Sequence, residues 1–171
     1  GLITLADDIT ISETMNILAD KNVTINLNGK ILTNKLDNTN TDVLTVAAGG
    51  TLIIDGEGTV EAVTGNDGYA VISDGTLIIN GGIFKSGVDA NGEANAVIYA
   101  RGNGKIYVNG GTFPNDSDSK YVLNKKDQDR ATTVIEVTGG KFQNFNPGDN
   151  AAEGPGTNFL ADGYTVKKDG D

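Results

Sequence analysis

The sequence contains no cysteine, histidine or tryptophan among its 171 residues, and it has only three prolines and one methionine. Without cysteine the chain can form neither a disulfide nor a thiolate nucleophile, and without cysteine and histidine it lacks the usual ligands of zinc. The absence of histidine also excludes a Ser-His-Asp triad and proton transfer by an imidazole near neutral pH. Composition therefore removes most familiar catalytic sites.

Positive charge is also scarce, with 13 lysines and arginines against 23 acidic residues, a formal net charge of -10 and a pI near 4.3. Nucleic acids and anionic membranes are bound by dense basic patches, which this chain lacks. No window approaches the roughly 18 to 20 apolar residues that are needed to cross a bilayer. We therefore expect no nucleic-acid partner and no membrane insertion. The chain begins with Gly1 rather than methionine, so we expect a processed chain or a piece of a longer polypeptide.

Glycine, by contrast, is abundant, with 24 residues, and five glycines close five similar segments of the chain. Successive members of this set lie 25 to 29 residues apart: Gly29, Gly56, Gly81, Gly110 and Gly139. A fixed period of this length is typical of solenoid proteins.

In each segment before the glycine, two aliphatic positions flank one variable position. Such alternation, followed by Asn-Gly or Asp-Gly, predicts a short strand with one buried face and a sharp turn after it. The first aliphatic column holds Ile25, Leu52, Leu77, Ile106 and Ile135, and the second holds Leu27, Ile54, Ile79, Val108 and Val137.

Two further strands are expected in each repeat. The second strand follows the glycine turn and places Phe84, Phe113 and Phe142 in register, which predicts a stack of rings inside the core. The third strand covers residues 43–44, 71–72, 97–98 and 121–123, and the sequence leaves open which of its residues point inward. Three short strands per repeat predict an all-β parallel β-helix of about five to six coils.

We expect the β-helix to cover residues 1–142, with an N-terminal coil or cap at 1–20, and an irregular C-terminal cap or the start of a following segment at 143–171. The connections 33–42, 85–95 and 114–120 are long and polar, whereas the Asn-Gly turn is expected to keep a constant length. The column of Asn28, Asp55, Asn80 and Asn109 before the turn favours a structural asparagine ladder over a ligand site.

Three motifs carry a resemblance to a known family: residues 22–32 with the sequence NVTINLNGKIL, residues 109–113 with NGGTF, and residues 161–166 with ADGYTV. The chain resembles the right-handed parallel β-helix, or pectate-lyase-like, superfamily. More narrowly, it is similar to the non-catalytic repeats of bacterial surface proteins and phage virion proteins. The resemblance implies a single-stranded right-handed helix over nearly the whole chain, but it specifies no activity.

The catalytic chemistry of that superfamily finds no match in this sequence. The resemblance implies calcium held by Asp or Glu with an Arg or Lys base in the lyases, and clustered Asp with His in the hydrolases. The only arginines are Arg101 and Arg130, neither of which stands beside a paired Asp in the alignment, and Asp7-Asp8 suits a solvated turn. We therefore assign no catalytic residue and expect no enzyme.

Calcium is the one cofactor for which the sequence offers candidate ligands. Residues 89–93 and 115–118 alternate oxygen donors, yet neither segment completes an EF-hand loop or a glycine-rich nonapeptide repeat. Solvated loops are the favoured interpretation, and no metal or other cofactor is expected.

One outward-facing column suggests a contact surface. The variable position between the two aliphatic columns is Asn26, Ile53, Ile78, Tyr107 and Glu136, which is apolar in its middle three members. Stacked apolar residues form a continuous patch, and such patches mark interfaces, so we expect this stripe to contact a partner chain or a terminal segment. The alternative is simple β-propensity on an exposed strand.

Tyr69, Tyr99 and Tyr121 near strand ends, together with Arg101, are candidates for carbohydrate contact. The hypothesis is therefore a non-enzymatic structural and binding module, extracellular on a virion or bacterial cell surface, that engages a glycan or neighbouring subunits, including copies of itself. A small polysaccharide lyase or hydrolase is the alternative, and a bare spacer is a third.

Overall fold

Seventeen short strands pair in parallel through the residues that the computed structural model describes, which are 1–34, 42–63, 68–88, 96–116 and 119–169. They form three sheets, and each circuit of the chain adds one strand to each sheet. The protein is thus an all-β parallel β-solenoid with three strands per coil, as the repeat predicts. Sheets of six, six and five strands agree with the expected five to six coils.

The strands of each sheet follow one another along the solenoid. Sheet A contains β1 (Leu2–Thr4), β4 (Asn22–Asn26), β7 (Thr51–Asp55), β10 (Thr76–Ile79), β13 (Lys105–Val108) and β16 (Val134–Val137). Sheet B contains β2 (Ile9–Ile11), β5 (Lys30–Asn34), β8 (Gly58–Glu61), β11 (Ile83–Lys85), β14 (Thr112–Phe113) and β17 (Lys141–Phe142). Sheet C contains β3 (Met15–Ile17), β6 (Leu44–Val46), β9 (Val71–Ser73), β12 (Ile98–Ala100) and β15 (Leu123–Lys125), and a short 3-10 helix, η1 (Asp127–Asp129), follows it.

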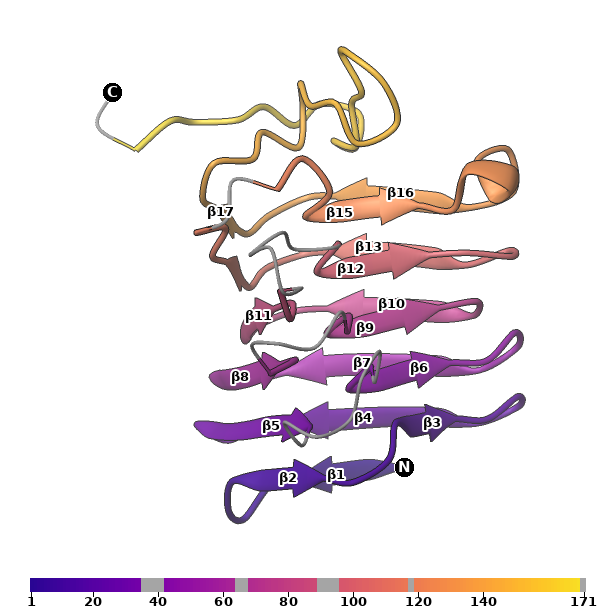
Figure 1. The fold of residues 1–171 in the computed structure, drawn as a ribbon, viewed down its shortest axis with the longest axis vertical. Helices are drawn as coiled ribbons and strands as arrows, with labels where there is room; N and C mark the ends of the chain where they lie inside the picture. The colour runs from indigo at the N-terminus through magenta and orange to yellow at the C-terminus, as the bar shows by residue number, and fades with distance from the viewer. Residues whose placement is uncertain (35–41, 64–67, 89–95, 117–118, 170–171) are drawn as a thin grey trace.

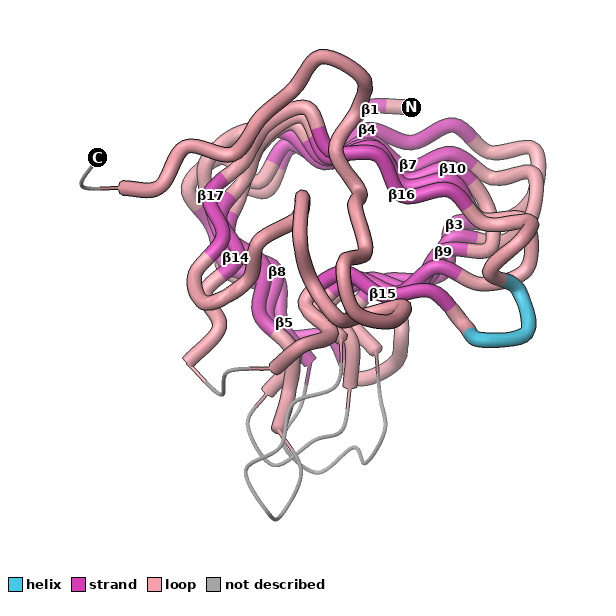
Figure 2. The backbone as a smooth tube through the Cα atoms, turned by 90° about the horizontal axis from the view of Figure 1, so that it is seen from above, coloured by secondary structure: helices cyan, strands magenta, loops and turns pink. Residues whose placement is uncertain are grey.

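The coils stack along the long axis of the molecule, with the N-terminal coil at one end (Figure 1). Seen from the C-terminal end, the three sheets surround a common interior (Figure 2). The chain runs counterclockwise in this view from sheet A through sheet B to sheet C as it rises toward the viewer, so the solenoid is right-handed. This is the hand that parallel crossover connections nearly always adopt.

Inward-facing columns fill the interior as the alternation predicts. Leu52, Leu77 and Ile106 pair in register in sheet A and are completely buried. In sheet B the Phe113 ring stacks on those of Phe84 and Phe142, with centroid separations of 5.4 and 4.7 Å, which confirms the predicted aromatic ladder.

Sheet C settles the orientation of the third strand. Leu44, Val71, Ile98 and Leu123 form one inward column and are completely buried. The next residue of each strand faces outward, which gives the column Thr45, Ile72, Tyr99 and Asn124.

The pairing of β4 with β7 differs from the expected alignment by two residues. Alignment on the glycines pairs Ile25 with Leu52, but the structure pairs Val23 with Leu52 and Ile25 with Ile54. The expectation of a constant turn length is the error. The turn is counted between the core position that pairs with Ile54 in sheet A and the outward position that pairs with Thr59 in sheet B. It spans residues 26–30 in the second coil, 55–58 in the third and only 80–82 in the fourth.

The wider turn of the second coil has a local cause. Asn28 (φ 50°) and Gly29 (φ 74°) adopt left-handed conformations one after the other, so the chain reverses over more residues. The side chain of Leu27 fills the inside of this corner and is completely buried. In later coils the corner is narrower, and a Cβ atom on Gly82 would lie 2.7 Å from Leu27 Cδ1.

The two ends of the solenoid differ. At the C-terminal end, residues 143–169 cross the last coil, where Leu160 bridges to Val137 while Ala152 and Phe159 are buried in the core. At the N-terminal end, Ile3 occupies an inward column in register with Ile25, yet its exposed fraction is 46% because no described coil lies beneath it. No helix within the described ranges is long and apolar enough to span a membrane.

Candidate functional site

The corner between sheets A and B is built from stacked glycines that leave no room for side chains. A Cβ atom on Gly81 would lie 2.8 Å from the carbonyl oxygen of Gly56. Added Cβ atoms on Gly110 and Gly139 would lie closer than 3.0 Å to the carbonyl oxygens of Asn80 and Asn109. The repeated glycine therefore permits close approach between the backbones of successive coils.

The second glycine of each pair serves a different purpose. Gly82, Gly111 and Gly140 have φ values of 94°, 93° and 114°, which L-residues with side chains rarely adopt. These glycines turn the chain into sheet B. Together the two glycine columns produce a narrow corner whose outer surface is bare backbone.

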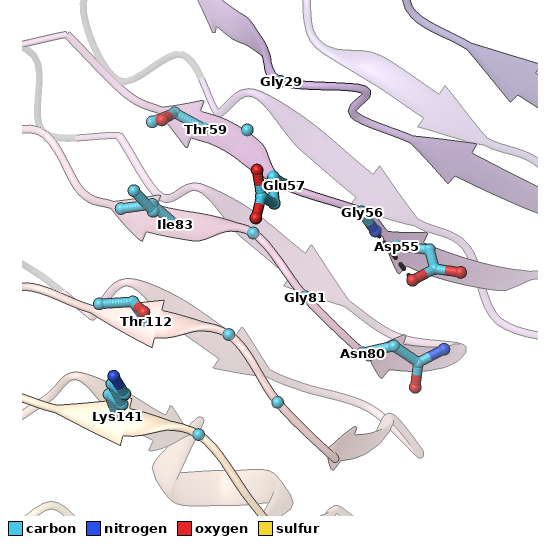
Figure 3. A pocket seen from close by; sticks show the side chains of 15 residues that line it. Gly29, Asp55, Gly56, Glu57, Thr59, Asn80, Gly81, Ile83, Thr112 and Lys141 are labelled. Atoms are coloured by element: carbon cyan, nitrogen blue, oxygen red, sulfur yellow. Dashed lines mark hydrogen bonds between the residues drawn. The ribbon is translucent and has the colours of Figure 1, made fainter.

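This bare corner is the floor of an open groove of about 930 Å³ that runs across the coils (Figure 3). One bank is the outward column of sheet B, formed by Thr59, Ile83, Thr112 and Lys141. The other bank consists of Asp55, the last residue of β7, and Asn80, the residue after β10. The floor and the remaining wall consist of Gly29, Gly56, Glu57, Gly58, Gly81, Gly82, Gly110, Gly111 and Gly140.

A hydrogen-bonded ladder holds the polar side chains beyond the ends of the sheet A strands. Asn109 Nδ2 donates to Asn80 Oδ1 at 3.0 Å, and Thr138 Oγ1 donates to Asn109 Oδ1 at 2.9 Å. This confirms the predicted ladder for Asn80 and Asn109. Asn28 does not belong to the column, because Asn26 pairs with Asp55 there and Asn28 Nδ2 donates to Leu5 O instead.

The charged side chains of the groove lie toward opposite ends. Asp55 and Glu57 belong to the third coil and are exposed, and Asp55 Oδ1 accepts a hydrogen bond of 2.8 Å from the backbone N–H of Gly56. Lys141 begins β17 in the sixth coil and is also exposed. The lining between them contains only uncharged residues.

The predicted apolar stripe exists in part on the outer face of sheet A. Ile78 pairs in register with Ile53 on one side and Tyr107 on the other, and all three are half-buried. Glu136 continues the column on one side, and on the other Thr24 rather than Asn26 follows Ile53 because of the shift in β4, with Leu2 beyond it.

The structure brings two of the predicted tyrosines together on the side of sheet C. The Tyr69 and Tyr99 rings stack with centroids 5.0 Å apart and planes inclined by 16°. Tyr121 is not part of this pair, since its half-buried ring packs against the core with the ammonium of Lys120 4.7 Å from its centroid.

Arg101 lies close enough to Tyr99 to affect its ionisation. The Nε atom of Arg101 donates to both carboxylate oxygens of Asp74, at 3.0 and 2.9 Å. Burial raises the pKa of the Tyr99 hydroxyl above its ordinary value of 10.0, the carboxylate of Asp127 adds to this rise, and the guanidinium of Arg101 opposes it. The arginine already has a carboxylate partner, which reduces its value as a free cation for a ligand.

No group of three or more Asp, Glu, His or Cys among the described residues could hold a metal ion. The calcium candidate at 89–93 lies outside the described residues, as do 117–118 of the second candidate. Of Asp7 and Asp8, Asp8 Oδ1 accepts a hydrogen bond from the backbone N–H of Ile31 in β5, so this carboxylate links the first coil to the second.

The groove was not anticipated from the sequence. Its signal was present in the Gly-Gly pairs 81–82, 110–111 and 139–140, which indicate a row of residues without side chains at one corner. Comparisons of the chain with protein-family models, with curated proteins and with solved structures find no match.

Proposed function

We propose that this chain is a non-enzymatic β-solenoid module that binds an extended glycan along the groove between sheets A and B. We further propose that it does so outside the cell, on the surface of a virion or a bacterium. The observation that carries the proposal is the groove itself, which is open, crosses successive coils and presents polar side chains from the third to the sixth coil.

The dimensions of the groove suit an extended polymer. Its lining runs from Gly29 in the second coil to Lys141 in the sixth, so at about 4.8 Å per coil it spans about 19 Å. On one bank the hydroxyl groups of Thr59 and Thr112 lie two coils apart with Ile83 between them, and the amide of Asn80 lies on the other bank in the intermediate coil. An extended sugar chain offers hydroxyl groups at regular intervals and would lie along such a repeat, whereas pockets for compact ligands are enclosed and mostly apolar.

A pair of matched variants tests the groove. Ile83→Arg places a long cation in the groove wall, whereas Ile31→Arg makes the same change in the same outward column of sheet B but outside the groove lining. The exposed fractions of the two isoleucines are 37% and 39%, so the expected effects on folding are equal. Binding would be measured on an array of neutral, acidic and amino-bearing polysaccharides and then by calorimetry.

We expect the wild-type chain to retain at least one polysaccharide, Ile31→Arg to match it, and Ile83→Arg to bind at least about tenfold more weakly, since each 1.4 kcal/mol lost in binding is a factor of ten. A blank array, or equal binding by the two variants, would refute the proposed site. Release of reducing or unsaturated ends from any bound polysaccharide would show instead that the chain is a lyase or hydrolase.

The apolar stripe of Ile53, Ile78 and Tyr107 supports a second, weaker contact with a neighbouring subunit or another copy of the chain. The outer face of sheet A measures about 15 by 24 Å from the strand length and spacing. Two such faces in contact bury roughly 700 Å² in total. Stable protein interfaces bury at least about 1,200 Å². This surface therefore suits a contact that adds to others in an assembly.

A further inference from the structure

We infer that the groove selects a glycan that carries both amino groups and acidic groups over neutral glycans and over glycans of a single charge sign. This inference rests on the glycan-binding function proposed above, and it adds the chemical class of the ligand. It follows from the positions of Asp55, Glu57 and Lys141 along the groove.

The acidic end of the groove lies at the turn of the third coil. The side chains of Asp55 and Glu57 are both exposed there, on either side of Gly56 (Figure 3). One oxygen of Asp55 is engaged by the Gly56 backbone N–H, which caps the turn. Carboxylates accept charge-assisted hydrogen bonds from an ammonium group, so this end favours an amino sugar.

The basic end lies three coils further along. Lys141 is in register with Thr112, and its exposed ammonium group favours a carboxylate, sulfate or phosphate on the ligand. Three coil spacings place Lys141 about 14 Å from the turn that carries Glu57. Within the described part of the chain, none of Asp55, Glu57 and Lys141 forms an ion pair.

Other charges near the groove do not remove this polarity. Glu61 and Lys85 lie in the next outward column of sheet B and pair with each other at 3.7 Å. Lys30 lies outside the lining of the groove but is in register with Gly58, next to Glu57, so the acidic end holds two carboxylates against this one ammonium group.

The distance between the two charged ends of the groove determines which ligands bind more tightly. Solvent-exposed charges are largely screened beyond about 8 to 10 Å at physiological salt, so Glu57 and Lys141 scarcely neutralise each other across about 14 Å. Each end therefore acts on the ligand charge next to it. A polyanion is attracted at Lys141 but repelled at Asp55 and Glu57, and a polycation experiences the reverse.

The test uses four oligosaccharides of similar length: a neutral glucan, an oligogalacturonate, a fully deacetylated glucosamine oligomer, and an oligomer of alternating glucosamine and glucuronic acid with free amines. Calorimetry would compare the wild-type chain with Glu57→Gln and Lys141→Met. Glu57 is changed rather than Asp55, because Asp55 caps the turn. Glu13→Gln and Lys105→Met are the matched controls, since both side chains are exposed and lie outside the groove.

We expect the wild-type chain to bind the mixed-charge oligomer most tightly, and each groove variant to weaken that binding by a factor of about 1.4 to 5, the range for exposed charge pairs. The control variants should match the wild type. Binding of glycans with no preference for the mixed-charge oligomer, or a preference that survives both groove variants, would overturn the inference while leaving the proposed function intact. Failure of all four oligomers and of the polysaccharide array would overturn the function and the inference together.

Discussion

The clearest test of the glycine corner is at Gly110, where replacement by alanine adds a single methyl group. The φ of Gly110 lies outside the left-handed region, so alanine can adopt its backbone conformation. The new Cβ atom would lie closer than 3.0 Å to Asn80 O, whereas ordinary van der Waals contact begins at 3.4 Å. The fifth coil must therefore rise from the fourth by more than about 0.4 Å, or the turn must deform.

The energetic cost of Gly110→Ala has two parts. Overpacking of a tight contact costs about 1 to 3 kcal/mol. The same displacement strains the hydrogen bonds that the backbone N–H groups of Asn109 and Gly110 donate to Ile79 O, at 2.8 and 3.2 Å, and their loss adds about 0.5 to 1.5 kcal/mol each. Alanine also lowers the conformational entropy of the unfolded chain, which stabilises the folded state by about 0.4 to 1 kcal/mol and offsets part of this cost. We expect a net loss of about 2 to 4 kcal/mol.

Urea unfolding followed by far-ultraviolet circular dichroism would measure this loss as a lower midpoint at unchanged slope. Gly29→Ala is the control, because Gly29 has a φ of 74° but no atom within 4 Å of an added Cβ atom. Its left-handed conformation alone should cost about 1 to 2 kcal/mol. If Gly110→Ala destabilises the protein no more than Gly29→Ala, close stacking of the coils is not the reason for the glycine.

Three further predictions concern the core, the tyrosine pair and the apolar stripe. Phe113→Ala should lower the free energy of unfolding by about 3 to 5 kcal/mol, because the ring is completely buried between Phe84 and Phe142; a loss below about 1 kcal/mol would contradict the aromatic ladder. Because the pKa of Tyr99 is raised, its ionisation opposes folding, so this contribution to stability is complete below pH 10 and is lost as the pH rises through the folded-state pKa. Tyr99→Phe should therefore flatten the alkaline fall in melting temperature, and an unchanged fall would show that Tyr99 is not its source. Ile78→Asp should weaken any self-association seen by sedimentation at high protein concentration, and an unaltered profile would remove the stripe as a contact.

Most of the fold follows from two features of the sequence, the period of the repeat and the alternation within it. Side-chain alternation fixes which face of a strand is buried, so the columns of Leu52 and Ile54 could be assigned to the core without a structure. The same logic placed Phe84, Phe113 and Phe142 together.

The register of β4 could not be predicted in this way, because glycine marks a turn without stating how many residues the turn contains. In the second coil the left-handed pair Asn28 and Gly29 lengthens the turn, and Leu27 fills the space inside it. Only the three-dimensional stacking of the coils shows that Thr24, not Asn26, continues the column of Ile53.

The groove escaped prediction for a related reason. A search for chemistry in a sequence looks for side chains, but this site is formed where side chains are absent. Its polarity depends on Glu57 and Lys141, which lie 84 residues apart in the sequence and share one corner only because three coils separate them. The stacked Tyr69 and Tyr99 were easier to propose, since aromatic residues near strand ends are visible in the sequence itself.

The direction of the backbone hydrogen bonds gives the molecule a definite mechanical behaviour. Because every sheet joins one coil to the next, a force applied along the solenoid axis would separate neighbouring coils one after another. Each released circuit of 25 or 29 residues in the middle of the chain, as measured from β7 to β10 and from β10 to β13, adds about 80 to 100 Å of extended chain. The molecule would thus lengthen in steps under tension, and the part of the groove on the coils still stacked would keep its shape.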